Sequence, residues 1–178
     1  RFEALSPGFV DVLTASYSWN AQYEERVNQG GNGNPAAAIN HEPERTRTHA
    51  LQARAVKAAG RHTLSFGGDL SFEKVSGVSV AEIATTGVTT LRRGRVPDGS
   101  TYRSGGVYLQ DSFDPSPRAH LVGAVRASFA RYQSTSATAP VVNGRPLWPD
   151  DRLSASSVTF RAGASYELTR GLRAIGHV

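Results

Sequence analysis

The segment HTLSFGGDLSFEKV, residues 62–75, alternates between apolar and polar positions with a period of two. On its apolar side lie Leu64, Phe66, Gly68, Leu70 and Phe72. The residues between them are small, polar or acidic. A β-strand places alternate side chains on opposite faces, so the two faces of this strand meet different surroundings. Those surroundings are either a protein core and water, or membrane lipid and a wet lumen.

The same alternation recurs along the chain and predicts about seven strands. The further segments are residues 10–23, 49–58, 102–113, 119–132 and 158–168, with a last strand from Leu172. Residues 49–58 also suit a helix, because Ala, Leu, Gln, Arg and Lys favour helical structure. We expect a strand there because the segments on both sides of it are strands.

The connections between these strands alternate between long and short. The long polar connections are residues 24–48, 76–101 and 133–157, and the short turns are residues 59–61, 114–118 and 169–171. The strands reach about ten residues or more, whereas strands of globular sheets are usually about five or six residues long. Long strands with tight turns at one end and long loops at the other are typical of outer-membrane β-barrels.

The composition of the two faces also favours a barrel. The apolar face is rich in Ala and Gly, whereas a protein core needs larger side chains to fill its volume. Aromatic residues are expected near the long-loop end at Trp19, Tyr23, Phe72, Phe129 and Phe160, and near the short-turn end at Phe113 and Tyr166. This is the placement of interfacial girdles, although aromatic residues at the ends of a sandwich core are an alternative. Asp111 interrupts the apolar face near the end of its strand.

We therefore predict an all-β fold of antiparallel up-and-down strands that forms part of a large transmembrane outer-membrane β-barrel. The residues expected to face its lumen are Arg54, Asp69, Glu73, Arg126, Arg161 and Glu167. Charged side chains in a wet lumen can pair with one another and need no catalytic role.

Composition and charge exclude several other classes of protein. The 178 residues include no Cys, which excludes a disulfide framework and a thiolate metal site. The net charge is +5, but arginines are mixed with acidic residues, which predicts a solvated surface and no nucleic-acid partner. No apolar run is long enough for a membrane helix.

The chain starts at Arg1 and stops inside an alternating segment, so we expect an internal piece of a longer protein.

Three stretches resemble the barrel of TonB-dependent outer-membrane receptors. They are residues 62–75, 104–132 and 158–178. In that family a strand ending in Tyr-x-Gln-Asp enters a short periplasmic turn, the next strand carries an inward Arg, and a later strand of the F-x-A-G-x-S-Y-x-L-T kind precedes a Gly turn. The residues that match this order are Tyr108, Gln110, Asp111, Arg126, residues 160–169 and Gly171. The resemblance covers most of the chain.

The resemblance implies a plugged barrel of about 22 strands, of which residues 1–178 would supply a partial barrel of about seven. The plug and the segment that contacts TonB would lie outside this chain. Such a receptor resides in the outer membrane of a Gram-negative bacterium and imports a scarce nutrient such as a ferric siderophore, haem or cobalamin. The implied partners are the TonB complex, a small-molecule or metal-chelate ligand, outer-membrane lipid and lipopolysaccharide, with no cofactor and no metal centre.

Residues of the predicted long loops are the candidates for ligand binding. They are His41, Arg92, Arg93, Arg95, Arg145 and Trp148. Guanidinium groups match carboxylate and phosphate groups, so these arginines, with Arg45 and Arg47, could attract an anionic siderophore or bridge lipopolysaccharide phosphates. Trp148 opens the sequence WPDD, which could dock a ligand or form an ordinary turn. Residues 30–35, GGNGNP, lack the Lys and Ser/Thr of a phosphate loop and predict a flexible loop.

Two other functions remain open at this point. The first alternative is a passive porin, or an enzyme of the outer membrane, which would have the same barrel but no plug. The sequence does not support an enzyme, because it has no spacing typical of a Ser/His/Asp, Cys/His or paired-carboxylate site. A soluble all-β adhesion or carbohydrate-binding module would use Trp19 and Trp148 as sugar platforms. A plug domain distinguishes the transporter from the porin, and dependence on detergent distinguishes both from the soluble module. The sequence does not identify the nutrient.

Overall fold

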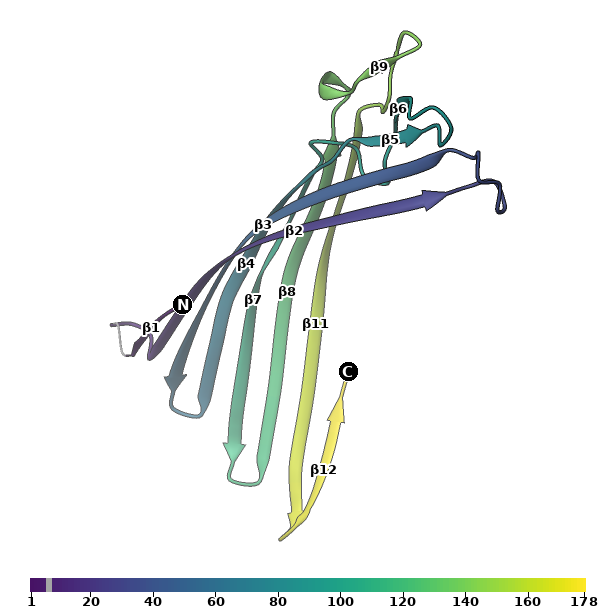
Figure 1. Cartoon of the computed structure of the whole chain (residues 1–178). Coiled ribbons are helices and arrows are strands. Elements are labelled where there is room, and N and C mark those ends of the chain that lie inside the picture. The colour runs from purple at the N-terminus through teal and green to yellow at the C-terminus, as the bar shows by residue number, and fades with distance from the viewer. Residues whose placement is uncertain (6–7) are drawn as a thin grey trace.

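The computed structural model describes residues 1–5 and 8–178, which form one large antiparallel sheet with small additions (Figure 1). The long strands are β2 (Val12–Gln29), β3 (Ile39–Ala59), β4 (His62–Ser76), β7 (Thr101–Ser116), β8 (Ala119–Ser134) and β11 (Asp151–Thr169). Consecutive long strands are neighbours, so the predicted all-β, up-and-down arrangement is confirmed, including a strand at residues 49–58. Within the described ranges, no helix has the length and apolar character needed to cross a membrane.

Shorter strands flank the long ones. At one side β1 (Phe2–Leu5) pairs with residues 12–15 of β2, and at the other β12 (Leu172–His177) pairs with the last part of β11, from Gly163 onward. A hairpin of β5 (Ser79–Glu82) and β6 (Thr89–Arg92) lies in the connection from β4 to β7. The connection from β8 to β11 contains the 3-10 helix η1 (Ser136–Thr138) and a hairpin of β9 (Val141–Val142) and β10 (Arg145–Pro146).

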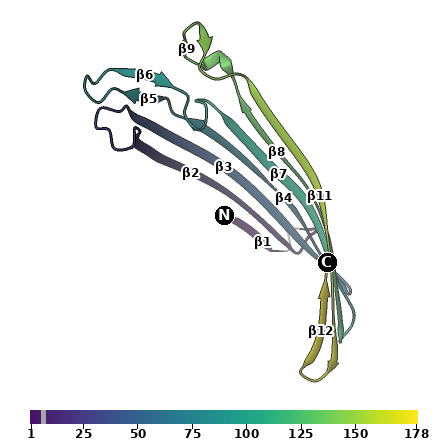
Figure 2. The ribbon, with the colours of Figure 1, turned by 90° about the vertical axis from the view of Figure 1, so that its right-hand side faces the viewer.

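The long connections gather at one end of the sheet. Figure 1 shows β5, β6 and β9 at the end opposite the tight turns between β3 and β4, β7 and β8, and β11 and β12. The side view shows a curved sheet that is one layer thick (Figure 2). Gly60 and Gly171 lie in two of the tight turns with φ of 63° and 89°, which favours glycine because other residues are strained at positive φ. The predicted alternation of long and short connections is thus present.

Several strands extend into segments that were predicted as loops. The differences are residues 24–29 and 39–48 in β2 and β3, residues 151–157 in β11, and residues 114–116 in β7. In β7 a register shift between Phe113 and Ser116 accommodates the residues expected to end the pairing. The other extensions are polar on both faces, so their hydrogen bonds continue where the period-two signal has already stopped.

Pro43 shows how the sheet tolerates a proline inside β3. β4 pairs with β3 as far as Arg45, and β5 pairs with β3 from His41 onward, so Pro43 lies in the gap between these two partners. The carbonyl of Pro43 points into this gap, toward Gly77. Because Pro has no N–H to donate, a position with no partner strand on this side suits it, while β2 pairs with it on the other side at Glu25.

The register aligns the predicted apolar residues of five strands into a continuous band. Across β3, β4, β7, β8 and β11 the rows are Leu51–Leu70–Gly105–Phe129–Ser156, Ala53–Gly68–Val107–Ala127–Val158 and Ala55–Phe66–Leu109–Val125–Phe160. Leu70, Val107 and Phe160 are 55%, 64% and 79% exposed, so the described part of the chain leaves these side chains of the band uncovered. Phe160 lies midway along β11, which corrects its expected place near the long-loop end.

The band has the height of a membrane core. From Arg103 to Asp111, the two charged residues on the apolar face of β7, the strand rises about 27 Å at about 3.4 Å per residue. At a tilt of about 40° this projects to about 21 Å, slightly less than the apolar belt of about 25 Å in an outer-membrane barrel. Near the short turns, Asp111 on this face lies 2.8 Å from Nδ1 of His62, whose ring stacks on Phe113. The carboxylate that interrupts the apolar face is therefore paired.

Candidate functional site

The candidate ligand-binding residues lie in two groups at the long-connection end of the sheet. His41, Arg92, Arg93 and Arg95 surround the place where the β5–β6 hairpin joins β3, and Arg145 and Trp148 belong to the connection from β8 to β11. Two arginines expected in a loop, Arg45 and Arg47, instead belong to β3 and lie on its apolar-face side, in rows above Leu51.

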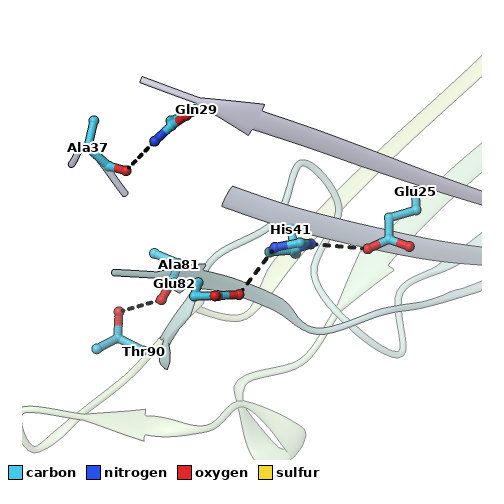
Figure 3. Close-up of polar contacts among 7 residues, drawn as sticks. All are labelled: Glu25, Gln29, Ala37, His41, Ala81, Glu82 and Thr90. Carbon is cyan, nitrogen blue, oxygen red and sulfur yellow. Dashed lines mark hydrogen bonds and ion pairs between the residues drawn. The ribbon is translucent and has the colours of Figure 1, made fainter. Parts of the chain in front are cut away.

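His41 links three strands through its two ring nitrogens. Nδ1 lies 3.3 Å from Oε1 of Glu25 on β2, and Nε2 lies 3.6 Å from Oε2 of Glu82 on β5 (Figure 3). Nearby, Gln29 donates to the Ala37 carbonyl (Figure 3). Both nitrogens of His41 face carboxylates, so a role in binding haem or metal requires these contacts to open.

Two arginines of the first group are engaged on the polar face of the β2–β3 extension. Nη2 of Arg95 lies 3.4 Å from Oε1 of Glu24, and its Nε lies 3.9 Å from Oε2 of Glu42. Arg92 donates to the side-chain oxygen of Asn40. These contacts hold the end of β6 and the connection after it against β2 and β3.

Arg93 and Arg145 differ from Arg92 and Arg95 in having free guanidinium groups. Both are exposed, and neither forms a side-chain hydrogen bond or an ion pair within residues 1–5 and 8–178. Of the predicted candidates, these two are available to an anionic ligand without breaking an internal contact.

Trp148 is 1% exposed and organises the loop that carries Arg145. Its Nε1 donates to the Thr135 carbonyl at 2.9 Å. Next to it, the backbone N–H of Ser136 donates to Asp150 at 2.6 Å, and this bond, with the Ser136 hydroxyl, lowers the pKa of Asp150. The indole is closed off from solvent in this arrangement, so its burial supports a role in holding the loop.

On the polar face, the central feature is an ion pair between Asp69 and Arg126. Nη2 of Arg126 donates to Oδ1 of Asp69 at 2.7 Å, and its Nε donates to Ser128. The guanidinium crosses Gly106, where a Cβ would lie 2.7 Å from Nη2 of Arg126. Glycine at this position therefore makes room for the ion pair.

The remaining charges predicted for the lumen lie on this same polar face. Glu73 accepts a hydrogen bond from Thr48 at 3.2 Å, and Arg54 donates to Ser65 at 3.2 Å. Glu167 lies directly opposite Arg173 in the register of β11 and β12. Arg161 lies opposite Ala124 and is exposed.

Sequence reasoning missed the residues that hold the first group together. Glu24, Glu25 and Glu42 fall in the stretch expected to be a loop, and the strands of the β5–β6 hairpin are only four residues long. Such short strands give too few positions for a period-two signal. Among the described residues, no group of three or more His, Cys, Asp or Glu side chains is placed to hold a metal ion.

Comparison with known proteins relates this sheet to a family of barrels. The family model described as TonB dependent receptor-like, beta-barrel matches residues 3–176. No curated protein matches the chain.

Two solved structures resemble the chain in fold. The copper transporter OprC has a TM-score of 0.71 and 12% identity, with 94% of this chain and 26% of OprC covered. The ferric yersiniabactin uptake receptor FyuA from Yersinia pestis has a TM-score of 0.61 and 19% identity, with 91% of this chain and 24% of FyuA covered. The chain thus spans about a quarter of the length of either structure.

Proposed function

Because the chain belongs to the TonB-dependent receptor-like β-barrel family, we propose that it forms part of an outer-membrane receptor that imports a scarce nutrient. The observation that carries this proposal is the family match over residues 3–176. The continuous apolar band, backed by a polar face with the Asp69–Arg126 ion pair, agrees with lipid outside and a wet lumen inside. Residues 1–178 then supply a partial barrel, completed by further strands and a plug.

The proposed orientation places the long connections outside the cell and the tight turns in the periplasm, as in other outer-membrane barrels. The lumen-facing residues are Arg54, Asp69, Glu73, Arg126, Arg161 and Glu167. They contact one another or the plug, and TonB delivers energy through the plug region. The protein acts in transport and carries out no chemical reaction on its ligand.

We propose an anionic metal chelate as the ligand. The two solved relatives are named as a copper transporter and a ferric yersiniabactin uptake receptor, which points to metals as the cargo class. Arg93 and Arg145 offer free guanidinium groups, which bind carboxylate groups in a bidentate manner. Arg92, Arg95 and His41 support the same surface through their contacts with β2, β3 and β5.

Uptake measurements on intact cells test the function. Cells grown under metal limitation are supplied with a panel of radiolabelled ferric siderophores and with labelled copper. Uptake of one chelate should disappear when the receptor gene is deleted and when tonB is deleted. Uptake that needs the receptor but persists without TonB would identify a passive porin instead.

Binding measurements test the residues. In the complete receptor, the double variant Arg93→Gln/Arg145→Gln should bind the transported chelate about tenfold or more weakly, because two charge-assisted contacts are lost. The matched control is Arg118→Gln/Arg170→Gln, which removes two exposed arginines from the short turns. Equal affinity in the two double variants would remove Arg93 and Arg145 from the site.

A further inference from the structure

The β5–β6 hairpin is attached to the main sheet by a short stretch of pairing. Each of its strands has four residues, and in the described part of the chain it pairs with β3 at Ile39, Asn40 and His41. A two-stranded hairpin is at best marginally stable in water, so side-chain contacts decide how firmly this one is held. The hairpin ends at Arg92 and leads directly into Arg93. Its position therefore influences the position of Arg93, one of the two free guanidinium groups of the candidate site.

His41 connects this hairpin to the main sheet through two glutamates on its own face of the sheet. Glu25 of β2 and Glu82 of β5 are diagonal neighbours of His41 in the two registers, and the imidazole lies between their carboxylates (Figure 3). Nδ1 is 3.3 Å from Glu25, which is within hydrogen-bond distance, whereas Nε2 is 3.6 Å from Glu82. The longer contact is thus the one to the hairpin. The ring is partly exposed, so it can exchange protons with the solution.

Only a charged imidazole can donate to both carboxylates. A neutral imidazole has one N–H group and one nitrogen lone pair, whereas an imidazolium has two N–H groups. With a neutral His41, one of the two glutamates faces a lone pair, which repels its negative charge. Protonation gives each glutamate a charge-assisted hydrogen bond. Histidine is the side chain that gains this proton between about pH 8 and about pH 5, a range in which glutamate stays ionised.

The other charged and titratable groups on the main-sheet side hold Glu25 in place. The Tyr23 hydroxyl donates to Oε2 of Glu25 at 3.1 Å, which leaves Oε1 for His41. The guanidinium of Arg45 lies 5.4 Å from the centre of the Tyr23 ring. Glu25 is therefore a fixed anchor on β2, and its contact with His41 does not depend on the hairpin.

On the hairpin side, His41 is the partner of Glu82. Within the described ranges Glu82 forms no other ion pair. The β6 residues paired with this face of β5, Thr89 and Leu91, carry no charge. The nearby cations Arg92 and Arg95 contact the polar face of the β2–β3 extension, on the other side of the sheet. The attachment of Glu82 therefore depends on the charge of His41.

We infer that His41 is a pH-sensitive latch, whose protonation ties Glu82, and with it the β5–β6 hairpin, to Glu25 on the main sheet. The latch goes beyond the proposed function, because it operates without any ligand. In the proposed orientation the hairpin lies outside the cell, so the acidity of the medium decides how firmly it is held. An acidic medium fixes the hairpin and the start of the connection that carries Arg93, and an alkaline medium loosens them.

Hydrogen exchange in the complete receptor, reconstituted in nanodiscs, tests the latch. Protection factors of residues 79–92 are measured at about pH 5 and about pH 8, because protection factors correct for the effect of pH on the chemical exchange rate. The wild-type hairpin should be about threefold or more better protected at the lower pH, as expected for two partly exposed ion pairs. His41→Gln and Glu82→Gln should each remove most of this difference, because either variant lacks one partner of the contact to the hairpin.

The matched control is His49→Gln. His49 is an exposed histidine of the same strand, and its Nδ1 lies 2.7 Å from the Tyr17 hydroxyl instead of facing the hairpin. This variant should keep the wild-type difference, and heat-modifiable migration in gels shows that each variant is folded. Equal protection at the two pH values in the wild type, or a difference that persists in His41→Gln, would overturn the inference. PH-dependent protection in a receptor without TonB-dependent uptake would support the latch and contradict the proposed function.

Discussion

Replacing Val107 with arginine tests whether lipid covers the apolar face. Val107 lies on the apolar face of β7, four positions from Arg103 on one side and from Asp111 on the other. At about 3.4 Å per residue and a tilt of about 40°, this places it about 10 Å in depth from either charged row. An arginine at the middle of a lipid-facing strand destabilises a barrel by about 2–4 kcal/mol.

Two further variants make the prediction specific to face and depth. Leu70→Arg is one row below Arg103 and Arg131, where the new side chain can extend to the membrane surface, so we expect a loss of about 1 kcal/mol or less. Ser71→Arg is on the polar face, between Ala50 and Ser104, and should change the stability little.

The assay is urea unfolding of the complete barrel in phospholipid vesicles, with the free energy of unfolding obtained by linear extrapolation. The expected order of destabilisation is Val107→Arg, then Leu70→Arg, then Ser71→Arg. A larger loss for Ser71→Arg than for Val107→Arg would show that the two faces are assigned the wrong way round. Equal losses for all three would show that no lipid contacts the sheet.

Three other perturbations follow from single contacts. Gly106→Ala should destabilise the barrel by about 1–3 kcal/mol in urea unfolding, because its Cβ would collide with Arg126, whereas Gly123→Ala, with open space around it, should change little. The hydrogen bonds that lower the pKa of Asp150 stabilise its loop fully above the ordinary aspartate pKa of about 3.9, and this stabilisation is lost as the pH falls through the lowered value. Proteolysis of the loop from about pH 7 to about pH 3 should therefore rise at the acidic end, and Asp150→Asn should remove this pH dependence. Trp148→Ala should loosen the same loop by about 3 kcal/mol, seen as faster protease cleavage there while the barrel keeps its unfolding midpoint.

The sequence predicted the membrane-height part of the sheet well because two different solvents impose alternation there. Leu64, Phe66, Gly68, Leu70 and Phe72 fall on one face of β4, and the register places their neighbours on β3 and β7 on the same face. The resemblance drawn from Tyr108 to Asp111 and from residues 160–169 is confirmed by the family match. Where both faces meet water, the constraint disappears, so the strand character of residues 24–29 and 151–157 was not predictable from periodicity.

The candidate site was less predictable than the sheet. Positive charge in the long connections could be read from the sequence, but which arginines are free depends on contacts between distant segments, such as Arg95 with Glu24. The burial of Trp148 depends on the fold of its own loop. The opposed pair of Arg103 and Arg131 could be recognised only once the register of β7 and β8 was known. Which arginines are free, and which cations lie opposite each other, depends on how distant segments pair, and the composition of the chain does not reveal this.

The short reach of β1 and β12 restricts how this sheet can enter a membrane. Beyond residues 12–15 of β2, and before Ala162 of β11, the outer side of each strand presents N–H and C=O groups with no partner strand in the described part of the chain. In hydrocarbon each unsatisfied group costs several kcal/mol. These two margins can therefore cross into lipid only together with the strands that complete their hydrogen bonds. Closure of the barrel and insertion must be coupled, and this segment by itself is expected to associate through its margins with other copies.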